Sequence, residues 1–119
     1  MAFCNFHRPF VLGLVLALPT FGLAMAQQPP QIDWSRYLNS DELLRLMCDL
    51  ERAYPRLAKV RVIGKSTLGK DLHLMEITNS ETGPALSKPA IYIDGNMHTG
   101  EQTGAMLTLY IIKWLLTNY

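Results

Sequence analysis

A run of four apolar residues, Ala90 to Ile93, constrains the fold more than any other segment of this chain. A strand that is apolar at every position is typical of an inner strand covered on both faces of its sheet. Asp94 and Gly95 end this strand, and from Gly100 the apolar residues recur at helical spacing. A buried strand that leads into a helix predicts a domain of the α/β class.

The helix expected from Gly100 to Asn118 has an unusually wide apolar face. The residues on or beside this face are Ala105, Met106, Leu109, Ile111, Ile112, Leu115 and Leu116. The residues before the helix supply too little protein to cover so much apolar surface. We therefore expect Leu107, Leu109, Ile112 and Leu116 to be partly uncovered, and the chain to be the N-terminal part of a larger domain, truncated after Tyr119.

An amphipathic helix is expected after Asn39. Asn39 followed three residues later by Glu42 is a capping-box arrangement, in which each side chain bonds the other residue's backbone amide. Leu43, Met47 and Leu50 then recur on one face. Pro55 ends the helix, because proline disfavours helical geometry in the residue before it.

Two strands and a turn are expected after this helix. The segments Ala58 to Ile63 and Asp71 to Thr78 alternate apolar and polar residues, and Gly69 lies between them. This pattern predicts a β-hairpin. His73, a single histidine on the second strand, is interpreted as a surface or edge residue. The polar, proline-containing segment from Asn79 to Pro89 is expected to be a loop.

The first 26 residues have the parts of a secretory signal peptide. Arg8 precedes the apolar run Phe10 to Leu18, and Ala24 and Ala26 are the small residues that a signal peptidase recognises. Cleavage after Ala26 would start the mature protein at Gln27, secreted or periplasmic and without stable membrane association. An uncleaved membrane anchor is the alternative that the apolar run leaves open.

Charge and cysteine content narrow the possible functions further. Ten acidic and ten basic residues follow Ala26, so that part has no formal net charge and no basic stripe. This balance argues against a nucleic-acid-binding protein.

Cleavage would remove Cys4, so we expect Cys48 to pack as a small buried hydrophobe with no internal disulfide. An intermolecular disulfide is the alternative.

Two potential metal ligands follow the apolar strand. His98 and Glu101 lie three residues apart on the turn that enters the helix, where active sites gather in open α/β sheets. Zinc accepts both imidazole and carboxylate ligands. Asp94 could orient the imidazole, and Gly95 and Gly100 are expected to relieve crowding. An ordinary pair of solvated helix-end side chains is the alternative.

Several segments, taken in their order along the chain, resemble one protein family more specifically than the His98 and Glu101 spacing alone. The segment Asp94-Gly95-Asn96-Met97-His98-x-x-Glu101 resembles the first zinc-ligand motif of the carboxypeptidase A/B-like zinc metallocarboxypeptidases. Three upstream segments also resemble the family, in the family's order. Tyr54-Pro55-Arg56-Leu57 matches its Tyr-Pro segment. The next two, Ile63-Gly64-Lys65-Ser66 and Gly69-Lys70-Asp71-Leu72, are similar to its Ile-Gly-x-Ser and Gly-Arg-x-Ile segments. The resemblance extends from Tyr37 to Tyr119, essentially the whole mature chain.

The resemblance implies a fold and a reaction. Residues 1–26 would be the signal peptide, residues 27–36 an extended lead-in, and residues 37–119 the N-terminal part of a mixed-sheet α/β/α catalytic domain. The family holds a zinc ion with two His and one Glu, and metal-activated water hydrolyses a C-terminal peptide or related amide bond with a separate Glu as general base. His98 and Glu101 would be the first two zinc ligands. The third His, the general base and the other catalytic residues are not in this chain.

Several alternatives remain open within and beyond this resemblance. Digestive members carry Arg two places after the motif His, where this chain has Gly100, so the preference for a C-terminal residue is not given. Peptide trimming stays the favoured reaction, and related branches of the family that cleave amides of small acyl-amino acids or cell-wall peptides stay open as alternatives. The leading hypothesis is a zinc carboxypeptidase represented by an inactive chain. A catalytically silent peptide-binding relative is the second, and a membrane-anchored segment is the third.

Overall fold

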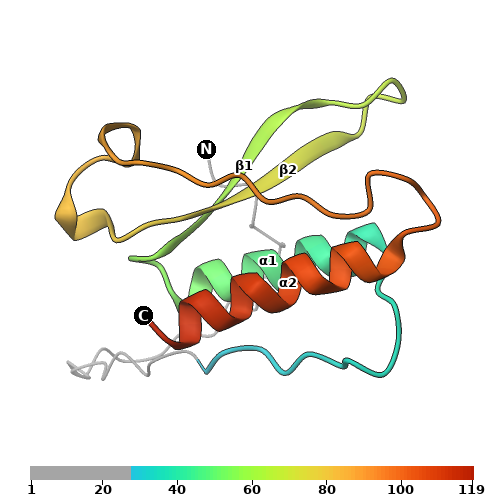
Figure 1. Cartoon of the computed structure of the whole chain (residues 1–119), viewed down its shortest axis with the longest axis horizontal. Helices are drawn as coiled ribbons and strands as arrows, with labels where there is room; N and C mark the ends of the chain where they lie inside the picture. Colours follow the sequence, from blue (N-terminus) through green and yellow to red (C-terminus); the bar gives the residue numbers. More distant parts are fainter. Residues whose placement is uncertain (1–27) are drawn as a thin grey trace, which may run out of the picture.

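The structure, a computed structural model, describes residues 28–119 (Figure 1). The expected signal peptide and its cleavage site at Ala26 lie outside the described residues. The described elements are, in chain order, α1 (Ser40–Ala53), β1 (Ala58–Lys65), β2 (Asp71–Ile77), the 3₁₀ turns η1 (Ser80–Thr82) and η2 (Ala85–Ser87), and α2 (Gln102–Thr117).

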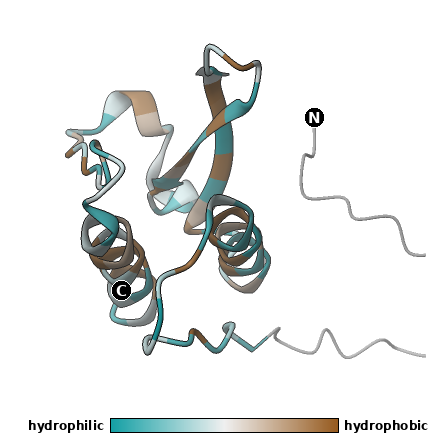
Figure 2. Cartoon of the chain, turned by 90° about the vertical axis from the view of Figure 1, so that its right-hand side faces the viewer, coloured by the Kyte–Doolittle hydropathy of each residue, from teal (hydrophilic) through white to brown (hydrophobic). Residues whose placement is uncertain are grey.

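The two helices lie side by side and run in the same direction, with the hairpin of β1 and β2 above them in Figure 1. Figure 2 looks nearly along the helices and separates them, with the hairpin above and the extended lead-in below. This is a small α/β arrangement with two helices and a two-stranded antiparallel sheet. The mixed sheet that the resemblance implies is not formed within residues 28–119.

Helix α1 begins and ends as its sequence predicts. Asn39 Oδ1 accepts a hydrogen bond from the Glu42 amide at 3.0 Å, and Glu42 Oε2 accepts one from the Asn39 amide at 2.9 Å. Both halves of the expected capping box are therefore present. The helix ends at Ala53, two residues before Pro55. Its apolar face is buried most completely at Leu50, which has no exposed surface.

The hairpin is also confirmed. Strands β1 and β2 pair from Ala58 opposite Ile77 to Lys65 opposite Asp71, with an irregularity between Val62 and Gly64. Gly69, in the turn, has φ +75°, a left-handed conformation that glycine adopts without steric cost. His73 lies opposite Val62 in a sheet whose two strands both have an open edge among the described residues, as expected for an edge position.

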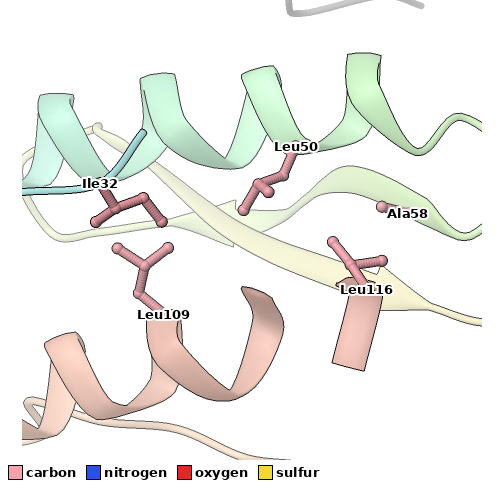
Figure 3. Packing of buried hydrophobic residues seen from close by; sticks show 5 residues of the cluster. All are labelled: Ile32, Leu50, Ala58, Leu109 and Leu116. Carbon is pink, nitrogen blue, oxygen red and sulfur yellow. The ribbon is translucent and has the colours of Figure 1, made fainter. Parts of the chain in front are cut away.

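The core lies between the helices and beneath the hairpin. Its buried residues come from the lead-in, α1, β1 and α2: Ile32, Leu50, Ala58, Leu109 and Leu116 (Figure 3). The expectation of a partly uncovered α2 face is right for Leu107, which is 56% exposed, and for Ile112, which is partly buried against the core. It is wrong for Leu109 and Leu116, because they pack into a cluster that includes Ile32, a residue without any periodic signal.

The expected inner strand, Ala90 to Ile93, is wrong for the described chain. Residues 90–96 form no strand, and Ile91 is 89% exposed. An inner strand requires hydrogen-bonded neighbours on both sides, and none of these residues makes a backbone hydrogen bond with another described residue. The apolar composition of the segment is consistent with a strand, but within residues 28–119 the segment pairs with neither β1 nor β2.

Cys48 differs from its expectation in one respect. Its side chain is buried, as expected for the apolar face of α1. Its sulfur belongs to a disulfide and is not a free thiol. The expectation that Cys48 has no internal disulfide is therefore wrong. Among residues 28–119, no helix combines the length and the apolar character needed to cross a membrane.

Candidate metal centre

The structure brings the side chains of His98 and Glu101 together. His98 Nδ1 lies 2.9 Å from Glu101 Oε1, within hydrogen-bond distance. The local backbone explains this contact, because the Glu101 amide donates to the His98 carbonyl at 2.9 Å and closes a turn. Residues at the two ends of such a turn project to the same side. Both side chains are accessible, with 75% of His98 and 60% of Glu101 exposed to solvent.

Two glycines position the loop that carries His98. A Cβ atom on Gly95 would lie 2.2 Å from the carbonyl oxygen of Gly104, which belongs to the first turn of α2. A Cβ atom on Gly104 would in turn lie 2.9 Å from the amide nitrogen of Asn96. The loop and the helix can therefore approach this closely only because both positions lack a side chain. The contact holds the loop that precedes His98 against the first turn of α2.

Asn96 has an unusual backbone conformation, and the two glycines Gly95 and Gly100 differ in how crowded their surroundings are. Asn96 has φ +62°, the left-handed conformation in which asparagine is found more often than most residues. The expectation that Gly95 relieves crowding is confirmed by its contact with Gly104. The same expectation for Gly100 is wrong, because no heavy atom lies within 4 Å of the Cβ position that a substitution there would add.

Glu101 does not use its carboxylate to cap the helix that follows. It occupies the N-cap position of α2 with φ −96° and ψ 45°, and no side-chain capping bond is formed. Its backbone carbonyl accepts the Gly104 amide at 2.9 Å and so starts the helix. The carboxylate is directed to His98 instead. A helix start that forgoes its usual cap leaves the Glu101 side chain available as a ligand.

Asp94 is not brought to His98 in the same way. Its carboxylate makes no hydrogen bond or ion pair with another residue of the described chain, and the residue is exposed. Among the described residues, the partner of the His98 ring is Glu101. The role of Asp94 in orienting the imidazole therefore stays a prediction.

The donor pair fits a zinc ion in chemistry and in spacing. Zinc is bound by imidazole nitrogen and carboxylate oxygen at about 2.1 Å, so two ligands of a tetrahedral site lie about 3.4 Å apart. The observed separation of 2.9 Å between His98 Nδ1 and Glu101 Oε1 would need to open only slightly to admit the metal. Within residues 28–119, no group of three His, Cys, Asp or Glu side chains could hold a metal ion. The pair alone therefore leaves the coordination incomplete.

The sequence singles out His98 and Glu101 as candidate ligands, but it does not single out the residues that pack and bond around them. Gly104 falls inside the expected helix, where a glycine is unfavourable and often marks a close backbone approach. Tyr37 was missed as well, and its hydroxyl oxygen lies 2.9 Å from the hydroxyl oxygen of Thr103 in α2. No pattern in the lead-in predicts that contact, because the two residues are far apart in the sequence.

The comparisons with known proteins agree on one family. The model of the zinc carboxypeptidase family matches residues 43–119. Carboxypeptidase D of Drosophila melanogaster is 30% identical over 98 residues, covering 82% of this chain and 7% of the relative. Carboxypeptidase SOL1 of Arabidopsis thaliana is 30% identical over 97 residues, covering 81% and 20%. Carboxypeptidase B of Astacus astacus is 30% identical over 87 residues, covering 73% and 27%. The chain thus spans about a quarter or less of the length of these relatives.

Proposed function

Since this chain belongs to the zinc carboxypeptidase family, we propose that it supplies two zinc ligands, His98 and Glu101, to a metallocarboxypeptidase. The reaction is hydrolysis of a C-terminal peptide bond or a related amide bond. The observation that carries this proposal is the 2.9 Å contact between His98 Nδ1 and Glu101 Oε1. Ordinary side chains three residues apart on a helical turn can make the same contact, so the support comes from its position within the segment that matches the family.

The residues of this chain have separate tasks in the proposed site. When bound, the zinc ion polarises the scissile carbonyl and activates a water molecule. His98 must be neutral to offer a nitrogen lone pair, so zinc affinity falls as the pH becomes acidic. Glu101 supplies a negative charge beside the metal. The close contact of Gly95 and Gly104 keeps the loop before His98 against the helix that begins after Glu101.

We propose that the 119-residue chain by itself binds zinc weakly and does not turn over peptides. Catalytic zinc sites have three protein ligands and one position for water. The sequence contains three histidines, His7, His73 and His98. His73 lies within β2, opposite Val62, and His7 lies outside the described residues. The third ligand and the general base would therefore come from elsewhere in a longer protein.

Zinc titration in competition with a chromophoric chelator tests the ligand pair. His98→Ala and Glu101→Gln should each weaken zinc binding more than about tenfold, because losing a ligand exceeds the effect of losing a supporting residue. His73→Ala and Glu81→Gln are matched controls and should leave the affinity unchanged. A His98→Ala chain that binds zinc as tightly as the wild type would contradict the assignment.

The second candidate function is a catalytically silent relative that binds peptides. The lack of a three-ligand group among residues 28–119 is consistent with it, as with the first candidate. Reading the gene past the codon for Tyr119 separates the two candidates. A further His and Glu in matching context would place the reaction in the longer protein. A stop codon there, with peptide binding that does not depend on zinc, would support the silent relative.

We also propose that residues 1–26 direct the protein to the periplasm or the cell exterior, where residues 37–119 would act as part of the catalytic domain. The support is the charged start, apolar middle and small-residue exit of the N-terminal segment. N-terminal sequencing of exported protein should begin at Gln27. A product that still begins at Met1 would contradict cleavage and favour the membrane-anchored alternative.

A further inference from the structure

The lead-in before α1 packs closely against α2, the helix that follows His98 and Glu101. We call these two proposed zinc ligands the metal pair. Ile32 is buried against Leu109 of α2, and Figure 3 shows the two side chains pointing toward each other. The ring of Trp34 meets Tyr110 edge to face, with 5.8 Å between the ring centroids. We call residues 32–37 the strap. The strap precedes residue 43, where the family match begins, so its contacts with α2 are not covered by that match.

Tyr37 makes the strap contact nearest to the metal pair. Its hydroxyl oxygen lies 2.9 Å from the hydroxyl oxygen of Thr103, and Thr103 is two residues after Glu101. This first turn of α2 has no side-chain cap. The hydrogen bond between the Tyr37 and Thr103 hydroxyls therefore holds the start of a helix that lacks a side-chain N-cap.

The segment that carries Tyr37 is also bonded to α1. Arg36, next to Tyr37, donates two hydrogen bonds to the Glu42 carboxylate, at 2.8 and 3.2 Å. Glu42 also accepts the Asn39 amide within the capping box. Tyr37 thus extends from a segment that is bonded to the first turn of α1, and it reaches the first turn of α2. The two helix starts are connected through one residue.

We propose that Tyr37 is a positioning residue for the metal pair. Its hydroxyl holds the first turn of α2 in place, so that the Glu101 carboxylate stays within reach of His98. This inference rests on the proposed function only in assuming that the pair binds zinc. The mechanical part, that Tyr37 stabilises the turn beginning at Glu101, can be tested without any metal.

The test compares Tyr37→Phe with Tyr110→Phe in the full chain. Both changes remove one hydroxyl from an exposed tyrosine at the strap–α2 contact, but the Tyr110 hydroxyl makes no hydrogen bond with the described residues. Amide hydrogen exchange at Gly104, whose amide bonds Glu101, should be about threefold faster in Tyr37→Phe, as expected for the loss of one exposed hydrogen bond. Zinc affinity, measured by chelator competition, should fall by about the same factor. Tyr110→Phe should change neither.

Thr103 provides the partner variants. Thr103→Val removes the hydroxyl at nearly constant shape, and combining it with Tyr37→Phe should produce no more loss than either change alone. Thr103→Ser keeps the hydroxyl and should retain most of the zinc affinity. Additive losses in the double variant would overturn the idea that the two residues act through one bond.

Two readouts keep this inference separate from the proposed function. Wild-type exchange rates at Gly104 in Tyr37→Phe would overturn the positioning role whatever the metal does. Faster exchange with unchanged zinc affinity would overturn it as well, because the turn would then not matter to the pair. A wild-type chain that binds no zinc would refute the proposed function alone, and the exchange rates would still decide whether Tyr37 holds the turn.

Discussion

Residues 39–78 and residues 79–101 of this chain differ sharply in how far their side chains are buried and bonded to one another. In the first region, Leu50 is fully buried and Arg61 forms two 2.9 Å hydrogen bonds to Glu76 on the neighbouring strand. In the second, Ile91 is 89% exposed and Tyr92 is 70% exposed. The difference shows that elements whose partners are local form completely, whereas an apolar segment that pairs with no other strand stays uncovered.

The largest expected effect contrasts one buried and one exposed apolar residue. Leu50→Ala should lower the free energy of unfolding by about 3 kcal/mol, because it removes a fully buried side chain from the core. Ile91→Ala should change it by less than about 0.5 kcal/mol. Urea unfolding followed by circular dichroism measures both. Equal losses in the two variants would mean that residues 90–93 are buried in solution and would break the contrast.

The next effect tests the backbone contact beneath the metal pair. Gly95→Ala should destabilise the chain by about 2 kcal/mol, because its Cβ would lie 2.2 Å from the Gly104 carbonyl oxygen and the loop must shift. Gly100→Ala is the matched control, and it should be nearly neutral because its Cβ would meet no heavy atom within 4 Å. Thermal unfolding of both variants provides the measurement. A neutral Gly95→Ala variant would show that the loop does not pack against α2.

A smaller effect contrasts the caps of the two regions. Asn39→Ala should lower stability by about 1 kcal/mol, since a 14-residue helix depends on that cap. Asn79 accepts the Glu81 amide at 2.8 Å, but it caps only the three-residue turn η1. Asn79→Ala should therefore cost less than Asn39→Ala in the same urea titration. Asn39→Ser should recover most of the loss, and a larger effect at Asn79 would contradict the contrast.

The smallest effect is a dependence of stability on pH. Hydrogen bonds from Arg36 and the Asn39 amide lower the pKa of Glu42 from 4.5 to about 2. Because the folded pKa lies below the unfolded one, the stabilisation is complete above pH 4.5 and is lost as the pH falls toward 2. Glu42→Gln should flatten this acid limb of the stability profile. High salt should flatten it in the wild type as well, because the ion pair with Arg36 is exposed and screened. An unchanged acid limb in Glu42→Gln would contradict the assignment.

Sequence reasoning succeeded where the signal lies within a few residues. The cap residues Asn39 and Glu42, and Gly69 in the hairpin turn, predicted α1 and the hairpin correctly. The spacing of His98 and Glu101 puts both residues on the turn that enters α2, where their side chains make a 2.9 Å contact. Each of these features depends on a turn or a helix end, whose geometry is set by the local backbone.

Sequence reasoning failed where the outcome depends on distant partners. The apolar composition of Ala90 to Ile93 indicates burial, but the segment pairs with no strand of the described chain, so the predicted inner strand does not form. Ile32 enters the core because Leu109 lies opposite it, which no periodicity in the lead-in could reveal. The same holds for the contact of Tyr37 with Thr103. Such contacts follow only from the packing of whole elements.

The central claim is that His98 is a zinc ligand, and zinc X-ray absorption of the metal-loaded chain tests it most directly. Scattering from imidazole ring atoms beyond the first coordination sphere identifies a bound histidine. The wild type and the His73→Ala control should both show this scattering, and His98→Ala should lose it. Imidazole scattering that persists in His98→Ala, or that disappears in His73→Ala, would contradict the account.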